Sequence, residues 1–146
     1  MQTNLRILQP DKLNTNMHLA KRIIVIFIIA FGLNFLWEHW HSAFYVHYQG
    51  LPITNAILTY TATFDGFFST ILAIPFLTIS ALKNKVWIGV LIVTTYSIGL
   101  EMYALETARW SYQATMPIIP LLGVGLTPTI QLGLLFYISC KIAQKV

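Results

Sequence analysis

The stretch "AKRIIVIFIIAFGLNFLWEHWHSAF" (20–44) opens on two basic residues, continues through an apolar run and ends among charged and aromatic side chains. A helix needs about 20 apolar residues to cross a hydrocarbon layer about 30 Å thick. The run after Lys21 and Arg22 approaches that length, so it predicts a first membrane span. A long polar stretch precedes this run and no small-x-small cleavage motif follows it, so we expect an uncleaved span and not a secretory signal.

The composition of the whole chain also indicates a membrane protein. Its 146 residues are 56% hydrophobic and 10% charged, whereas about a quarter of the residues in a soluble protein are charged. Three further runs, 64–82, 86–106 and 121–140, have the length and apolar character of spans. We therefore predict an all-α, polytopic four-helix transmembrane bundle that forms one domain over 20–146, preceded by a polar tail at 1–19.

Prolines and glycines are expected to interrupt the regular helices or to form a loop at three places. Pro75 is expected to kink the second span, because proline removes one backbone donor. Pro128 is expected to break the regularity of the fourth span and to free the carbonyl of Val124. The segment 45–60, which contains Gly50 and Pro52, is expected to form a loop, and whether part of it re-enters the membrane stays open.

The distribution of basic residues predicts the orientation. Of the nine Lys and Arg residues, only Arg109 falls on one side of the four-span arrangement, and an excess of such residues marks the cytoplasmic side. Both termini are therefore expected in the cytoplasm, with the protein in the cell membrane (the cytoplasmic membrane if the source is bacterial). The basic residues occur singly or in pairs, so the net charge of +4 does not indicate a nucleic-acid partner. The lipid bilayer is the expected partner, and homo-oligomer formation stays open.

Three acidic residues on three predicted spans lie at a similar depth. Glu38 follows Arg22 by sixteen residues and Glu101 follows Lys85 by sixteen, which places each roughly 24 Å from the inner face at 1.5 Å per residue. Asp65 precedes Lys83 by eighteen residues, roughly 27 Å by the same rise. The three carboxyl groups are thus expected just below the outer edge of the hydrocarbon.

Helical spacing gives these acids a common direction. Residues three, four and seven apart share one face of a helix, and lipid cannot satisfy polar side chains, so polar faces turn toward the bundle interior. The faces on the four spans comprise Asn34, Glu38, His41 and Tyr45; Asp65 and Ser69; Thr94, Ser97 and Glu101; and Thr127 and Gln131. We therefore predict a polar pocket that opens outward.

The chemistry of this pocket admits several interpretations. Glu38, Asp65 and Glu101 are the predicted catalytic groups, because carboxyl groups that share a site of low dielectric can act as general acid and general base. Glu38 and His41 also form Glu-x-x-His, the spacing by which di-metal bundles present two ligands from one helix. With Asp65 and Glu101 they would form a ligand set for Zn, Mn or Fe. The residues expected to contact the substrate or support the acids are Asn34, His41, Arg109, Trp110, Tyr112 and Gln131.

The outward parts of the chain resemble a group of small four-span bacterial membrane proteins that have no assigned reaction. The matching stretches are "NFLWE" (34–38), "FDG" (64–66), Glu101 and "WSYQATMPIIPLLGVGLTPTIQ" (110–131). Neither His39 nor His41 belongs to the shared pattern, so the resemblance favours the carboxyl groups over the histidines as the centre of a site. The matched positions are Asn34, Trp37, Glu38, Asp65, Glu101, Trp110, Tyr112, Met116, Pro117, Pro120, Gly123, Gly125, Pro128 and Gln131.

Three classes of function remain open from the sequence. The leading hypothesis is a membrane-embedded enzyme that uses acid–base or metal-assisted chemistry on a lipophilic substrate, such as a lipid or an isoprenoid-like molecule. The second is a carrier or subunit that binds a proton, a cation or a small solute, because intramembrane carboxylates mark ion paths. The third is a structural partner protein, in which the polar groups only fix how the helices pack.

Overall fold

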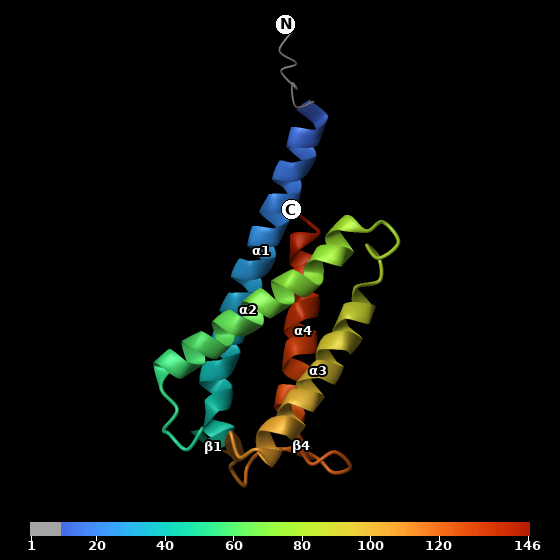
Figure 1. Cartoon of the computed structure of the whole chain (residues 1–146). Helices are drawn as coiled ribbons and strands as arrows, with labels where there is room; N and C mark the ends of the chain where they lie inside the picture. The colour runs from blue at the N-terminus through green and yellow to red at the C-terminus, as the bar shows by residue number, and fades with distance from the viewer. Residues whose placement is uncertain (1–9) are drawn as a thin grey trace, which may run out of the picture.

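The computed structural model describes the backbone of residues 10–146 and the side chains of residues 14–146. Four long helices form a bundle: α1 (Pro10–His41), α2 (Asn55–Thr78), α3 (Val86–Glu106) and α4 (Leu126–Ala143) (Figure 1). All four are long and apolar enough to cross a membrane. The predicted helical, four-span architecture is therefore confirmed at that level, and short strands that the sequence did not indicate are added to it.

Helix α1 begins earlier than predicted. It starts at Pro10 rather than near residue 20, so the part of the predicted tail from residue 10 to residue 19 is helical, whereas residues 1–9 lie outside the described chain. Proline suits the first turn of a helix, because its missing N–H would have no partner there. The helix ends at His41 and continues as one 3₁₀ turn, Ser42–Phe44.

Helix α2 also begins before its predicted start. Thr54 caps it by accepting a hydrogen bond at Oγ1 from the Ile57 amide at 3.3 Å, which satisfies one donor of the first turn. The prediction of a loop over 45–60 was therefore wrong for residues 55–60. The helix continues through Pro75 and ends three residues later, at Thr78 instead of residue 82.

The two later helices differ in how well their bounds were predicted. Helix α3 has the predicted bounds, 86–106. Helix α4 begins at Leu126, five residues after the predicted start, because Val124 and Gly125 form a strand instead. Pro128 is therefore the third residue of α4 and stands in the first turn, where proline is tolerated. The prediction that Pro128 interrupts the span was wrong.

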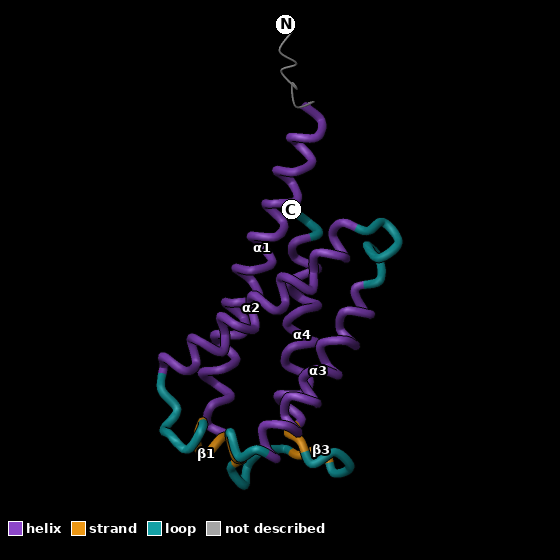
Figure 2. The backbone as a smooth tube through the Cα atoms, viewed as in Figure 1, coloured by secondary structure: helices purple, strands orange, loops and turns teal. Residues whose placement is uncertain are grey.

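Two small strand pairs lie at the end of the bundle opposite the start of α1 and the C-terminus (Figures 1 and 2). Strand β1 (Tyr45–Tyr48) pairs antiparallel with β2 (Trp110–Tyr112), and β3 (Ile118–Ile119) pairs antiparallel with β4 (Val124–Gly125). After β1 the chain reverses through Gln49 and Gly50, which both have positive φ (51° and 76°), as a type I′ turn requires. The first pair thus joins the α1–α2 connection to the α3–α4 connection.

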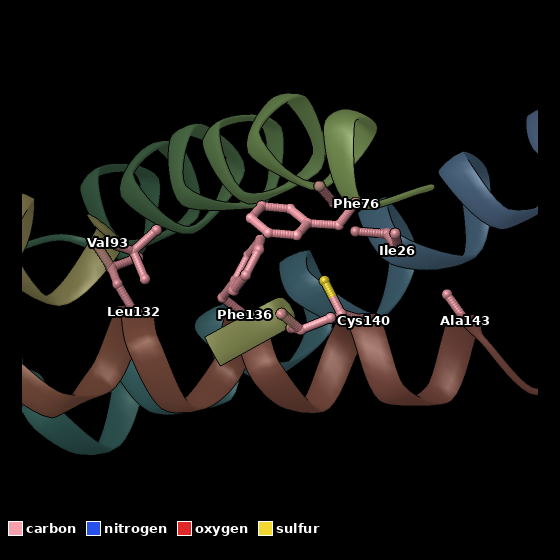
Figure 3. Packing of buried hydrophobic residues seen from close by; sticks show 9 residues of the cluster. Ile26, Phe76, Val93, Leu132, Phe136, Cys140 and Ala143 are labelled. Carbon is pink, nitrogen blue, oxygen red and sulfur yellow. The ribbon is translucent and has the colours of Figure 1, made fainter. Parts of the chain in front are cut away.

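The apolar core occupies the half of the bundle nearer the C-terminus, which is called the terminal half below. Phe76 and Phe136 meet edge to face, with ring centroids 6.1 Å apart, and Ile26 and Val93 are fully buried in the same cluster (Figure 3). Gly89 permits this close packing, because a Cβ atom there would lie 2.5 Å from the Phe136 ring. Apolar packing therefore closes the half of the bundle away from the strands, while the buried Asn34, His41, Glu101 and Gln131 lie toward the strand end.

Candidate functional site

A cavity of about 280 Å³ lies at the strand end of the bundle. Side chains from all four helices and from strands β1 and β2 line it. The three acids that the sequence singled out, Glu38, Asp65 and Glu101, all line this one cavity. Four of the predicted supporting residues also line it: His41, Arg109, Trp110 and Gln131.

Glu38 is held by an amide on the facing helix. Gln131 Nε2 of α4 donates to Glu38 Oε1 at 2.7 Å and to Asn34 Oδ1 at 3.1 Å. Asn34 in turn donates from Nδ2 to the Ala30 carbonyl at 2.8 Å. Asn34 and Gln131 are almost completely buried, so this chain of bonds fixes α1 against α4. Within residues 14–146, no donor contacts the second oxygen of Glu38.

Glu101 is the most fully bonded acid of the site. Its Oε1 accepts from the Tyr45 hydroxyl at 3.2 Å, and its Oε2 accepts from Trp110 Nε1 at 3.2 Å and from the Tyr112 hydroxyl. The Tyr112 oxygen also accepts from the Gly125 amide at 2.9 Å. A carboxyl group at the end of α3 therefore connects both strand pairs to the helices.

Both tyrosine hydroxyls on Glu101 are suited to remain donors. Burial, followed by the nearby Glu101 carboxyl, raises the pKa of Tyr45 well above its ordinary value. Burial and the hydrogen bond to Glu101 likewise raise the pKa of Tyr112. Because a raised pKa keeps the proton on a phenol, both groups donate throughout the physiological pH range. Tyr112 does not itself line the cavity, so it supports the acids through its hydrogen bond to Glu101.

Asp65 is the least bonded of the three acids. It stands in the middle of α2 and lines the same cavity as Glu38. No hydrogen-bond donor from residues 14–146 contacts its carboxyl group, in contrast to Glu101. The next residue, Gly66, lets α2 approach α1 closely, because a Cβ atom there would lie 3.2 Å from Phe31 Cβ.

The predicted metal ligands are not assembled as a set. His41 is buried, but its Nε2 lies 2.7 Å from Thr127 Oγ1, and Thr127 in turn donates to Met116 Sδ at 3.4 Å. In the part of the chain that the structure describes, no three His, Cys, Asp or Glu side chains form a group that could hold a metal ion. The arrangement thus does not fit Glu38, His41, Asp65 and Glu101 as four ligands of one Zn, Mn or Fe ion.

Arg109 lies at the edge of the cavity and is exposed. Its guanidinium stands 5.4 Å from the centroid of the Tyr103 ring, a distance typical of a cation–π contact. Among residues 14–146 no carboxylate is within ion-pair distance of Arg109. The only strong cation at this end of the described chain is therefore not neutralised by the acids of the site.

Three aromatic side chains that sequence analysis did not select form the mouth of the cavity. Tyr60 and Phe64 of α2 and Tyr96 of α3 line the cavity and are also 68%, 48% and 37% exposed. The cavity therefore reaches the surface between two helices that are each apolar enough to span a membrane. The four-residue spacing of Tyr60 and Phe64 was the available signal, because it places both rings on one helix face.

Comparison of the chain with protein-family models, with curated proteins and with solved structures finds no match.

Proposed function

We propose that this protein is a membrane-embedded enzyme that transfers protons to and from a lipophilic substrate, with Glu38 and Asp65 as the acid–base pair. The observation that carries the proposal is the unequal bonding of the acids that share the cavity. Glu101 accepts three hydrogen bonds, whereas Glu38 accepts one and Asp65 none within the described residues. Glu101 is therefore assigned to holding the site together, and the other two acids keep oxygens that are free to react.

The contacts also assign a role to each member of the pair. Because Gln131 donates to Glu38, the Glu38 carboxyl is arranged as an acceptor, which suits a general base. Asp65 receives no donor within residues 14–146 and lines the same cavity as Glu38, and a proton on one of two neighbouring carboxyl groups removes their mutual repulsion, so Asp65 suits the general acid. Asp65 gives one proton to the substrate and Glu38 takes one from it. A transfer from Glu38 to Asp65 then restores the starting state.

The mouth between α2 and α3 supports a lipophilic substrate. Exposed aromatic rings at Tyr60, Phe64 and Tyr96 border the mouth on two helices that suit a bilayer. A substrate dissolved in the membrane can enter there without passing through water. A carrier is less well supported, because Ile26, Phe76 and Phe136 fill the terminal half of the bundle and interrupt any polar path to that end.

The orientation of the protein is part of the proposal. The start of α1, the C-terminus and the α2–α3 connection lie toward one end of the bundle, and that connection contains Lys83 and Lys85. Because basic residues favour the cytoplasmic side, we propose that this end lies in the cytoplasm and that the cavity faces the outer leaflet of the cell membrane. Single cysteines at Gln49 and Asn84, in a Cys140→Ser background, test this. A membrane-impermeant thiol reagent should label the first in intact cells and the second only after lysis, and the reverse pattern would contradict the orientation.

Proton transfer can be tested without knowing the substrate. Purified protein in nanodiscs is incubated in D₂O with a total membrane lipid extract, and the lipids are then returned to ordinary water and measured by mass spectrometry. We expect wild-type protein to leave deuterium bound to carbon in one lipid class, and Glu38→Gln and Asp65→Asn to abolish it. Glu106→Gln, which changes an exposed acid at the end of α3, is the matched control and should retain the exchange. Wild-type protein that labels no lipid would contradict the proposed function.

A further inference from the structure

Arg109 and the α3 surface beside it have two chemically distinct parts, one cationic and one apolar and aromatic. The guanidinium rests over the Tyr103 ring at 5.4 Å and lacks an acidic partner among residues 14–146. Tyr96, Leu100 and Tyr103 follow at spacings of four and three along α3, so they share one helix face. Tyr96, Leu100 and Arg109 also line the cavity. An exposed cation therefore lies at one end of a row of apolar and aromatic side chains on α3, and this row extends along the cavity toward the acids.

We infer that this surface binds a single-chain amphiphile with a phosphate headgroup, the phosphate on Arg109 and the chain along Tyr96 and Leu100 into the cavity. That this ligand is also the substrate rests on the proposed function. The arginine fork matches phosphate geometry through paired N–H donors, and Arg109 follows the end of a span, the level at which headgroups lie. The Glu38 carboxylate repels an anion, so the headgroup stays at the rim while the uncharged chain lies beside Glu38 and Asp65.

The size of the cavity favours one chain over two. Ligand sites for drug-sized molecules measure about 300–1,000 Å³, and this cavity holds about 280 Å³. It therefore accommodates a segment of one hydrocarbon chain. The remainder of that chain can leave between Tyr60, Phe64 and Tyr96, whose exposed rings border the mouth.

The probe pair for a test is oleoyl lysophosphatidic acid and monoolein, which share a glycerol and an oleoyl chain and differ in the phosphate. Binding of each to detergent-purified full-length protein is titrated by native mass spectrometry. Because hydrogen bonds between charged groups are the strong ones, we expect the phosphate ligand to bind roughly tenfold more tightly or better. Arg109→Gln should remove that preference, whereas Lys83→Gln, which removes a cation at the other end, should keep it. Tyr96→Ala should weaken both ligands by a similar factor.

Several outcomes would overturn this inference. These are equal affinity of wild-type protein for both probes, a preference that survives Arg109→Gln, or affinities that Tyr96→Ala leaves unchanged. Displacement by inorganic phosphate at the same concentration as the lipid would also overturn it, because the ligand would then be free phosphate. The deuterium assay separates this result from the proposed function. Phosphate-selective binding without deuterium exchange would refute the proposed enzyme and support the binding site. Deuterium exchange without phosphate selectivity would support the enzyme and refute the binding site.

Discussion

Replacing Tyr112 by phenylalanine removes one oxygen atom that makes two hydrogen bonds. The hydroxyl donates to Glu101 and accepts from the Gly125 amide at 2.9 Å, so Tyr112→Phe breaks the link between β2, β4 and α3. Tyr112 lies in a connection outside the four candidate spans, so magnitudes from soluble proteins apply. A neutral hydrogen bond contributes about 1 kcal/mol and one to a charged group about 1.5–3 kcal/mol. The expected loss is therefore about 2–4 kcal/mol in the free energy of unfolding.

The assay is equilibrium unfolding in mixed detergent micelles, in which sodium dodecyl sulfate is titrated and tryptophan fluorescence is followed. Tyr137→Phe is the matched control, because Tyr137 is exposed on α4 and its ring contacts Lys141 without a hydrogen bond from its hydroxyl within the described chain. This control should change the free energy of unfolding by less than about 0.5 kcal/mol. If Tyr112→Phe also falls within that range, Glu101 does not anchor the strand pairs as argued.

Two further predictions use the same unfolding assay. Gln131→Leu should destabilise the protein by about 1–3 kcal/mol, because it removes two hydrogen bonds from α4 to Glu38 and Asn34, and hydrogen bonds between helices inside a membrane contribute about 0.6–1.7 kcal/mol each; a change below about 0.5 kcal/mol would mean that water replaces the amide. Gly89→Ala should cost about 1–3 kcal/mol, since its Cβ atom would lie 2.5 Å from the Phe136 ring. Gly99→Ala on the same helix is the control, because no atom lies within 4 Å of the added Cβ atom, and this variant should be neutral or stabilising. Equal effects of the two alanine substitutions on the free energy of unfolding would argue against the packing of α3 on α4.

The sequence predicted the helices well where hydropathy changes sharply at their ends. Helix α3 follows Lys85 directly and was predicted over its observed bounds. The starts of α1 and α2 were missed because residues 10–19 and 55–63 are polar or rich in threonine, and hydropathy detects the apolar part of a helix and not its extension into a polar layer. The start of α4 was missed for the opposite reason, because Val124 is apolar but belongs to a strand.

The acids of the cavity and a set of candidate supporting residues could be found from the sequence, but which supporting residue bonds to which acid could not. Depth counting and helical spacing selected Glu38, Asp65 and Glu101, because both depend on positions along single helices. Two of the three bonds to Glu101 come from Trp110 and Tyr112, which return to α3 only because β2 pairs with β1. Such a pairing between distant connections has no local sequence signal beyond the turn that follows β1. The partner of His41, Thr127, likewise comes from another helix.

The central claim is that carboxyl groups from separate helices meet in one cavity, and cysteine cross-linking tests it most directly. In a Cys140→Ser background, Glu38→Cys is combined either with Asp65→Cys or with Phe67→Cys, whose native side chain is 54% exposed on the same helix as Asp65. A short bifunctional maleimide is applied in membranes, and linked peptides are identified by mass spectrometry. The account predicts an intramolecular link for the pair at 38 and 65 and none for the pair at 38 and 67. A link only in the second pair, or in neither, would contradict it.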